Sequence, residues 1–322
     1  MDVTCAFYNV ENLFDTNDEP GKADDDFTPV GDFRWDVTKY NHKLDRIADV
    51  LFGMAHSGEL PAIVGLSEIE NAQVLEDLIQ HPALETGDYA FIHEESRDVR
   101  GIDVALLFRP NLFRYLDHEM INFEELTNTS FDARDILHVI GELPDGETLH
   151  VFVNHWPSRR AGKSDTEFKR IAAGTALRIA INKILEEEAE PLIVVMGDFN
   201  DEPHDKSIHS ALKAHEQADS DTALVNLAWP AVKDEAGTVE YDGDWFMFDQ
   251  LMVSGNMLRR APWKVRKGEM HIYTKGDVIF KGKHRKEVKP NRTYVGENYK
   301  GGYSDHLAVY LHLTKHPPSE AI

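Results

Sequence analysis

The chain contains 322 residues, 42% of them apolar, and its 57 Asp and Glu outnumber its 34 Lys and Arg to give a formal net charge of -23. A chain this acidic repels polyanions on average, which argues against tight non-specific binding of duplex nucleic acid. Its one cysteine, Cys5, excludes an intramolecular disulfide and a zinc site built from cysteines. No apolar run approaches the length of a membrane span.

The N-terminal residues bear on the expected compartment. Met1 to Thr4 lead straight into a strand-like segment, without the basic region and apolar stretch of a signal peptide. We therefore expect a cytoplasmic protein, or a secreted or periplasmic one whose signal peptide has been removed. Nothing in the sequence predicts the oligomeric state.

Short apolar runs typical of strands alternate along the chain with two segments of helical character. Apolar residues recur at helical spacing over residues 38–55 and predict one helix. The capping-box sequence Ser164–Glu167 predicts that a second helix opens there and continues to about Glu188. Mixed strands and helices without regular alternation favour an α/β or α+β sandwich with the sheets at its centre. The predicted strands are Val3–Val10, Ala62–Leu66, Asp103–Phe108, Ile136–Ile140, Val151–Asn154, Leu192–Met196, Asp249–Val253 and His306–Leu313.

Two segments differ from the rest in charge. Residues 15–36 are acidic and are expected to form a solvated surface loop. Residues 259–300 carry 13 Lys and Arg against 4 Asp and Glu, with five aromatic residues interleaved. This basic aromatic stretch suits a phosphate-rich or single-stranded ligand, and it equally suits a hairpin that neutralises acidic neighbours. Because the stretch lies between two candidate site residues, Asp249 and His306, we predict that it lines the substrate entrance.

Polar side chains suited to phosphate chemistry stand where the apolar runs stop or start. In a mixed sheet, the ends of some strands share an edge with the starts of others, so these side chains can meet in one crevice. They are Asn9 and Glu11 after the first run, Glu68, His155, Asp198 and Asn200 after later runs, and Asp249, Asp305 and His306 at the start of the last two. We predict that this edge is the active site.

Phosphoryl transfer requires a hard cation, a base near the attacking water, and donors aimed at the charge that develops. The carboxylates of Glu68 and Glu11 suit Mg²⁺, which prefers oxygen ligands. His306, oriented by a carboxylate such as Asp249, has the required acid–base character. The asparagines of the set can hold a phosphoryl oxygen without adding negative charge. These residue types predict a divalent-metal-dependent phosphoesterase.

Five short motifs occur in a fixed order along the chain. They are Phe7–Asn12, Leu66–Asn71, Val153–Ser158, Met196–Asp201 and Ser304–Leu307. In sequence and order they are similar to the signatures of the endonuclease/exonuclease/phosphatase superfamily, which includes pancreatic deoxyribonuclease, abasic-site endonucleases, neutral sphingomyelinases and inositol polyphosphate 5-phosphatases. The resemblance implies a four-layer α/β sandwich of two packed mixed β-sheets flanked by helices, formed by residues 1–322 as a single domain.

The resemblance also implies how metal and substrate are bound. Glu68 matches the principal metal ligand and Glu11 the carboxylate of a second site, with Mg²⁺ as the expected ion and Mn²⁺ as its alternative. Asp305 is expected to brace the loops or to complete the metal's surroundings. Asn9 is expected to contact substrate, as is Arg134, whose match to a phosphate-contacting arginine of some nucleases is loose.

Five further residues match the family's catalytic group. Asp198 would align or deprotonate the attacking water, and Asn200 would steady the phosphoryl oxygens. Asp249 and His306 would act as a pair. His155 matches a second histidine of the deoxyribonuclease branch, although it could instead simply cap its strand. Ser304 cannot form a triad with the two residues that follow it, because neighbours in a strand point to opposite faces.

The favoured function is hydrolysis of a phosphodiester. The acidic composition disfavours duplex DNA, whereas the basic aromatic stretch leaves room for short or single-stranded nucleic acid. A phosphomonoesterase acting on a phosphorylated small molecule or a lipid head group would use the same residues and stays open. An inactive binding scaffold is disfavoured, because the residues that such scaffolds lose are all present.

Overall fold

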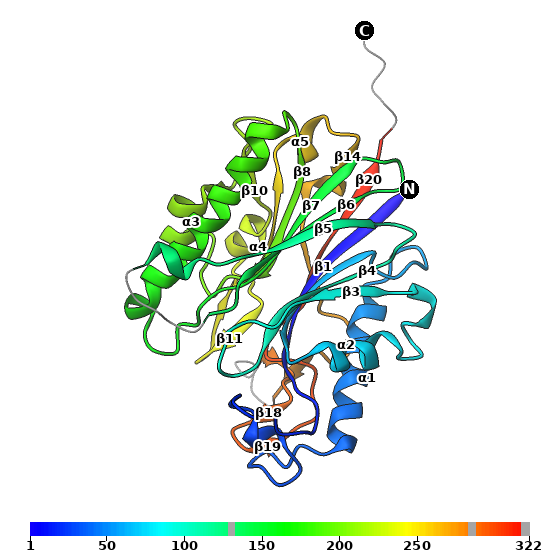
Figure 1. The fold of residues 1–322 in the computed structure, drawn as a ribbon, viewed down its shortest axis with the longest axis vertical. Helices are drawn as coiled ribbons and strands as arrows, with labels where there is room; N and C mark the ends of the chain where they lie inside the picture. Colours follow the sequence, from blue (N-terminus) through cyan, green and yellow to red (C-terminus); the bar gives the residue numbers. More distant parts are fainter. Residues whose placement is uncertain (128–132, 283–287, 317–322) are drawn as a thin grey trace.

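The computed structural model describes residues 1–127, 133–282 and 288–316. Two large mixed sheets pack face to face at its centre (Figure 1). Helices α1 (Val37–Gly53) and α2 (Ala72–Ile79) cover the outer face of one sheet, and α3 (Lys163–Glu187) covers the outer face of the other. The predicted four-layer α/β sandwich is confirmed. Shorter helical segments are α4 (Trp229–Lys233), α5 (Asn256–Arg259), a π-helix at Ser207–Leu212 and 3₁₀ turns at Asp25–Phe27, Glu85–Gly87, Glu124–Leu126 and Arg266–Gly268.

Each sheet combines parallel and antiparallel pairs. The first has the order β14-β20-β1-β2-β4-β3 with β15 beside β20, and the second has the order β5-β6-β7-β8-β13-β10-β9. The strands of the first are β1 (Asp2–Leu13), β2 (Ile63–Ile69), β3 (Ala90–His93), β4 (Asp103–Phe108), β14 (Trp263–Val265), β15 (His271–Ile272) and β20 (Val309–Lys315). Those of the second are β5 (Arg114–Ile121), β6 (Ile136–Glu142), β7 (Thr148–His155), β8 (Leu192–Asp198), β9 (Ala214–His215), β10 (Leu224–Asn226) and β13 (Asp249–Ser254). Three hairpins pair β11 (Val239–Tyr241) with β12 (Asp244–Phe246), β16 (Ile279–Lys281) with β17 (Val288–Pro290), and β18 (Tyr294–Val295) with β19 (Asn298–Tyr299).

Three apolar layers hold the sandwich together. One lies between the first sheet and α1 and α2, one between the sheets, and one between the second sheet and α3. Strand β1 contributes to two of them, because Tyr8 and Val10 face the helices whereas Cys5 and Phe7 face the other sheet. A strand covered on both faces needs apolar residues at successive positions, which is why the central strands read as continuous apolar runs.

The two predicted helices form close to the expected limits, with one correction. Helix α1 starts after Asp36, whose carboxylate accepts hydrogen bonds from the backbone amides of Thr38 and Lys39 in the first turn. Helix α3 begins at Lys163 rather than at a capping box, and its N-cap is Gly162 with φ 104. Ser164 therefore lies inside the first turn, and the hydroxyl of Thr166 donates instead to the carbonyl oxygen of Gly162. The predicted capping box is wrong because a glycine two residues earlier starts the helix.

The last predicted strand is also corrected at its start. Strand β20 begins at Val309, and His306 forms only an isolated bridge with Val239 before it. Asp305 and His306 thus lie in the segment that leads into the strand, where side-chain directions need not alternate. In the described part of the chain, no helix combines the length and apolar character needed to cross a membrane.

The basic aromatic stretch divides between opposite edges of the sheets. Strand β13, which precedes the stretch, carries the chain from the predicted site edge to the other edge, where the stretch begins and Arg260 pairs with Glu190 just before β8. The stretch returns through β14 and β15, which run antiparallel to β20. The prediction that the whole stretch lines the substrate entrance is therefore wrong for its first part, because a strand that starts at the site carries the chain away from it. Three of its cations, Lys283, Arg285 and Lys286, lie outside the described residues.

Candidate active site

Two bulges at the ends of β1 and β2 place the predicted metal ligands. The pairing register shifts between Asn9 and Leu13 on β1 and between Ser67 and Ile69 on β2. Within these bulges, Glu11 and Glu68 adopt left-handed φ values of 54 and 64. Such values are uncommon for residues other than glycine and re-aim side chains at strand ends. Glu11 and Glu68 are therefore unpaired in the strand register, and both lie at the same edge of the first sheet.

The second sheet contributes one row of three residues at its facing edge. Asp198 ends β8, His155 ends β7 and pairs with it in register, and Asp249 starts β13 on its other side. All three are buried. His155 Nε2 lies 3.6 Å from Asp198 Oδ2. The sequence pattern correctly predicted that these strand ends and starts would meet.

His306 completes the row from the first sheet. Its Nδ1 lies 2.8 Å from Asp249 Oδ2, and its Nε2 lies 3.8 Å from Asp198 Oδ2. Burial alone would lower the pKa of His306, but the charges of Asp249 and Asp198 raise it well above its usual value. The other oxygen of Asp249, Oδ1, is buried without a hydrogen-bond partner among the described residues. Asp249 thus keeps the imidazole of His306 protonated and orients it toward Asp198.

Asp198 is the common neighbour of this group. Burial raises its pKa to about 6, while His306 and hydrogen bonds from two asparagines oppose the rise. Asn9 Nδ2 donates to Oδ2 at 3.1 Å, and the backbone amide of Asn200 donates to Oδ1 at 3.0 Å. A carboxyl group with such a pKa can exchange a proton near neutral pH.

Asn200 occupies a left-handed position, with φ 49, directly after β8. Its side-chain Nδ2 donates to the carbonyl oxygen of Trp156 at 3.0 Å. Asn9 is fixed similarly, because its Oδ1 accepts the backbone amide of Glu11. Both amides are therefore held in place by the backbone around the site.

Arg134 lies behind His155. Its guanidinium is buried, pairs with Asp98, and donates to the carbonyl oxygens of His155 and Trp156 at 3.2 and 3.3 Å. Burial and the charge of Arg134 lower the pKa of His155 well below its usual value. His155 is accordingly neutral at physiological pH. Arg134 supports the site from within, and a direct phosphate contact by it stays a prediction.

Glu68 has one carboxylate oxygen engaged and one available. Its Oε2 accepts the backbone amide of Asn12 at 2.9 Å. Its Oε1 lies 3.8 Å from His155 Nε2 and accepts no hydrogen bond within the described residues. Its side chain is 15% exposed, so solvent reaches it. An oxygen of this kind is a suitable ligand for a divalent metal ion.

Glu11 and Asp305 instead share a cation from the protein. Arg292 lies 3.2 Å from Glu11 Oε1 and 2.9 Å from Asp305 Oδ2. Glu11 also accepts the amide of Thr293 at 2.7 Å and lies 4.0 Å from Lys43 Nζ. Burial and the charge of Asp305 raise the pKa of Glu11 to about 7, against the opposing charges of Lys43 and Arg292.

Lys43 and Arg292 were not singled out from the sequence. Lys43 is fully buried on α1, where its Nζ donates to Thr293 Oγ1 and to the carbonyl oxygen of Tyr303. Its position four residues before Ile47 on the apolar stripe could have revealed it, because a lysine there has to be buried. Arg292 was counted only as one cation of the basic aromatic stretch.

Two clefts flank this group, and Arg160 lines both. The first, of about 340 Å³, runs past Glu11 between arginine and aromatic side chains. The second, of about 380 Å³, borders Asn200. Neighbouring Arg159 is held by Asp201 and Asp205. The first cleft includes Phe14, Phe27, Phe33, Trp35, Arg100, Arg292 and Tyr294, and the second includes Ser158, Arg159, Tyr241, Phe246 and Phe248.

Residues 4–315 match the sequence model of the endonuclease/exonuclease/phosphatase family. The chain belongs to this family. A comparison with curated proteins found no match. The residues that the family resemblance singled out do converge on one edge, apart from Arg134, which lies behind it.

Solved structures confirm the fold of an endonuclease/exonuclease/phosphatase protein. TDP2 from D. rerio, complexed with single strand DNA product, is 15% identical with a TM-score of 0.60, over 98% of this chain and 99% of that one. The human Nocturnin catalytic domain with bound sulfate anion is 15% identical with a TM-score of 0.57, over 98% and 95% of the two chains. A family member from Bacteroides thetaiotaomicron is 16% identical with a TM-score of 0.57, over 98% and 99%. At these identities the likeness shows the fold.

Proposed function

We propose that this chain is a divalent-metal-dependent phosphodiesterase whose reaction is centred on Asp198. One oxygen of that carboxylate, Oδ2, lies 3.1 Å from Asn9, 3.6 Å from His155 and 3.8 Å from His306. A single acidic oxygen among an amide and two imidazoles can take a proton from water while its neighbours hold the phosphoryl group. This observation carries the proposal, and family membership supports the general class. Because both sheets supply residues to this centre, we also propose that the chain acts as a single domain.

In the proposed reaction, Asp198 accepts a proton from the attacking water. The water oxygen then forms a bond to phosphorus as the bond to the leaving oxygen breaks. His306, kept protonated and oriented by Asp249, donates a hydrogen bond to the phosphoryl oxygens as negative charge develops on them. Asn9 and Asn200, both fixed by backbone contacts, add neutral donors. The leaving oxygen takes its proton from solvent.

The residues present fit a divalent metal ion, which we propose to be Mg²⁺, with Mn²⁺ able to replace it. Glu68 offers a solvent-reached oxygen with no hydrogen bond from the described residues. Glu11 and Asp305 are proposed as the second group of carboxylates, since they already attract a cation in the guanidinium of Arg292. An ion between these two would have to take the place of that guanidinium. When bound, the metal would neutralise the phosphoryl oxygens and lower the pKa of water.

The two clefts favour a diester over a monoester. A diester carries a substituent on each side of phosphorus, and two clefts that share Arg160 as a lining residue border the site. Arginine and aromatic side chains in both clefts suit phosphates and stacked bases. Among proteins with this fold, TDP2 from D. rerio was solved with a single strand DNA product. We therefore propose short or single-stranded nucleic acid, rather than duplex DNA, as the substrate.

A substrate panel tests this proposal. Bis(p-nitrophenyl) phosphate, p-nitrophenyl phosphate, a single-stranded oligonucleotide and its duplex would be assayed after exhaustive chelation, then with Mg²⁺ or Mn²⁺ restored. We expect no turnover without metal, and faster turnover of the diester and single strand than of the monoester and duplex. Full activity in excess EDTA by metal-free protein, or turnover of the monoester alone, would contradict the proposal.

A further inference from the structure

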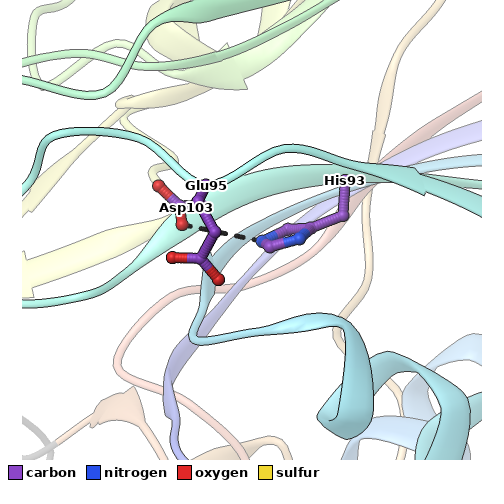
Figure 2. Close-up of side chains that lie close together, drawn as sticks. All are labelled: His93, Glu95 and Asp103. Atoms are coloured by element: carbon purple, nitrogen blue, oxygen red, sulfur yellow. Dashed lines mark ion pairs between the residues drawn. The ribbon is translucent and has the colours of Figure 1, made fainter. Parts of the chain in front are cut away.

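A second group of metal-ligating side chains lies between β3 and β4, outside the catalytic group (Figure 2). His93 ends β3 and pairs with Ala105 of β4. Asp103, two residues before Ala105, therefore points to the same face of the sheet as His93. Glu95 follows His93 by two residues, and one ligand atom of each of the three lies within 4.8 Å of the others. Figure 2 shows the imidazole directed at both carboxylates.

Two atoms of this cluster are buried without a hydrogen bond. The side chains of His93 and Asp103 are only 4% and 2% exposed. Nevertheless His93 Nε2 and Asp103 Oδ2 have no hydrogen-bond partner among the described residues. They lie 3.6 Å apart, which is too long for a hydrogen bond between them. Because buried polar atoms nearly always have a hydrogen-bond partner, an ion pair that leaves both of its facing atoms without one suits a ligand bound by both atoms.

The spacing of these atoms suits a metal ion. Two ligand atoms bound about 2.1 Å from a tetrahedral ion lie about 3.4 Å apart. The observed 3.6 Å is close to that value. One imidazole nitrogen with two carboxylates favours a first-row transition ion over Mg²⁺ or Ca²⁺, which prefer oxygen ligands alone.

The cluster is also open to ions and attractive to cations. Glu95 is 49% exposed and its Oε2 pairs with Lys22 Nζ at 3.0 Å, so a positive charge already approaches from the solvent side. Asp103 is oriented from behind, because its Oδ1 accepts the backbone amide of Ser96 at 3.0 Å. An entering ion would meet the half-exposed carboxylate of Glu95 at the entrance and the buried imidazole and carboxylate of His93 and Asp103 behind it.

We infer that His93, Glu95 and Asp103 bind one divalent transition-metal ion, with Zn²⁺ the favoured ion and water as its remaining ligand. The ion would tie the end of β3 to the start of β4 and so fix the loop between them. That loop carries Asp98, whose carboxylate pairs with Arg134 behind the catalytic His155. The site would thus support the catalytic edge without taking part in the reaction.

Metal binding to tag-free, chelated protein tests the site. A Glu68→Gln background removes the proposed principal catalytic ligand, and the binding that is lost when His93 is then substituted reports on this cluster rather than on the proposed Glu11 and Asp305 group. Zn²⁺ would be counted by elemental analysis after equilibrium dialysis, and Co²⁺ would be followed by its visible absorption. We expect the added substitution His93→Gln to lower the bound metal of the background variant by one equivalent. The matched control is His81→Gln, which alters a surface histidine paired with Asp45 and should change nothing.

A second variant guards against misfolding. Glu95 is half-exposed, so Glu95→Gln should leave the fold intact while weakening Co²⁺ binding at least about tenfold. If the background variant binds no ion, or if His93→Gln and Glu95→Gln bind with wild-type stoichiometry and affinity, the cluster is a polar contact bridged by water and the inference is wrong.

Discussion

Asp198 and Glu11 are both buried carboxylates at the same edge, and burial raises the pKa of each, to about 6 and about 7. Their partners differ. Asp198 is surrounded by Asn9, by the neutral imidazole of His155 and by His306, whose positive charge is already paired with Asp249. Glu11 is held by Arg292, by the buried Lys43 and by a backbone amide.

The difference separates a group that can exchange protons from one that is fixed. Asp198 can gain and lose a proton without leaving a charge unpaired, because its cationic neighbour His306 keeps Asp249 as a partner. Glu11 cannot be altered without leaving the buried ammonium of Lys43 short of its charge partner. We therefore expect changes around Asp198 to affect turnover more than folding, and changes around Glu11 to affect folding at least as much as turnover.

The largest effect is expected at Asp198 and His306. Asp198→Asn removes the proposed base, and His306→Gln removes the charge that faces the phosphoryl oxygens. Each should lower kcat by at least about a hundredfold, since positioned acid–base groups typically contribute ~10²–10⁴. Steady-state kinetics on a diester, with thermal unfolding as the check on folding, measure this. Asp117→Asn, on the exposed face of β5, is the matched control. Wild-type kcat in either well-folded variant would move the catalytic centre elsewhere.

Substitutions around Glu11 should lower the free energy of unfolding. Lys43→Met leaves Glu11 without its buried lysine partner, and we expect the free energy of unfolding to fall by about 3 kcal/mol. Urea denaturation measures it, with the exposed Lys183→Met on α3 as a control that should change by less than about 0.5 kcal/mol.

A double variant sharpens this expectation. Adding Glu11→Gln to Lys43→Met removes the charge that the lysine had neutralised, so part of the lost stability should return. Additive losses in the double variant would show that Lys43 and Glu11 are not coupled.

The smallest effect is expected from the basic aromatic stretch. Lys283, Arg285 and Lys286 precede β17, which leads directly to Arg292 at the site. Replacing the three with glutamine should raise KM for a polyanionic substrate several-fold and flatten its salt dependence, because a local positive field is lost. For bis(p-nitrophenyl) phosphate, kcat should change little.

The divided course of the stretch provides a control for that charge change. Arg259 and Arg260 lie at the opposite edge, where Arg260 pairs with Glu190 and Asp221. Replacing both with glutamine should leave KM unchanged. Equal effects of the two sets would show that overall charge, rather than position, governs recruitment.

The buried strands could be predicted from the sequence because both of their faces are covered. Strand β8 contains a continuous apolar run and was predicted from its first residue, although it continues two residues beyond the predicted end at Met196. Strand β5 was missed because most of its residues are exposed at a sheet edge and show no apolar pattern. The start of β20 was predicted too early, at His306. Apolar residues follow His306 directly, and the sequence alone does not show that pairing in the sheet begins only at Val309.

The site was predictable where its residues stand at the ends of buried strands. Asp198 and Asp249 follow that rule, and register then brings them together. Lys43 and Arg292 do not stand at the ends of buried strands. Their roles come from tertiary contacts with Glu11, which no local sequence pattern indicates. The buried position of Arg134 likewise depends on packing behind β7.

The pH dependence of turnover tests the central role of Asp198 most directly. Its pKa is raised to about 6, and it must be deprotonated to accept a proton from water. In the wild-type enzyme with saturating Mg²⁺, kcat/KM for a diester should therefore rise about tenfold per pH unit up to about pH 6 and then level off. The residual activity of Asp198→Asn should lack this acid limb. An unchanged acid limb in that variant would contradict the account.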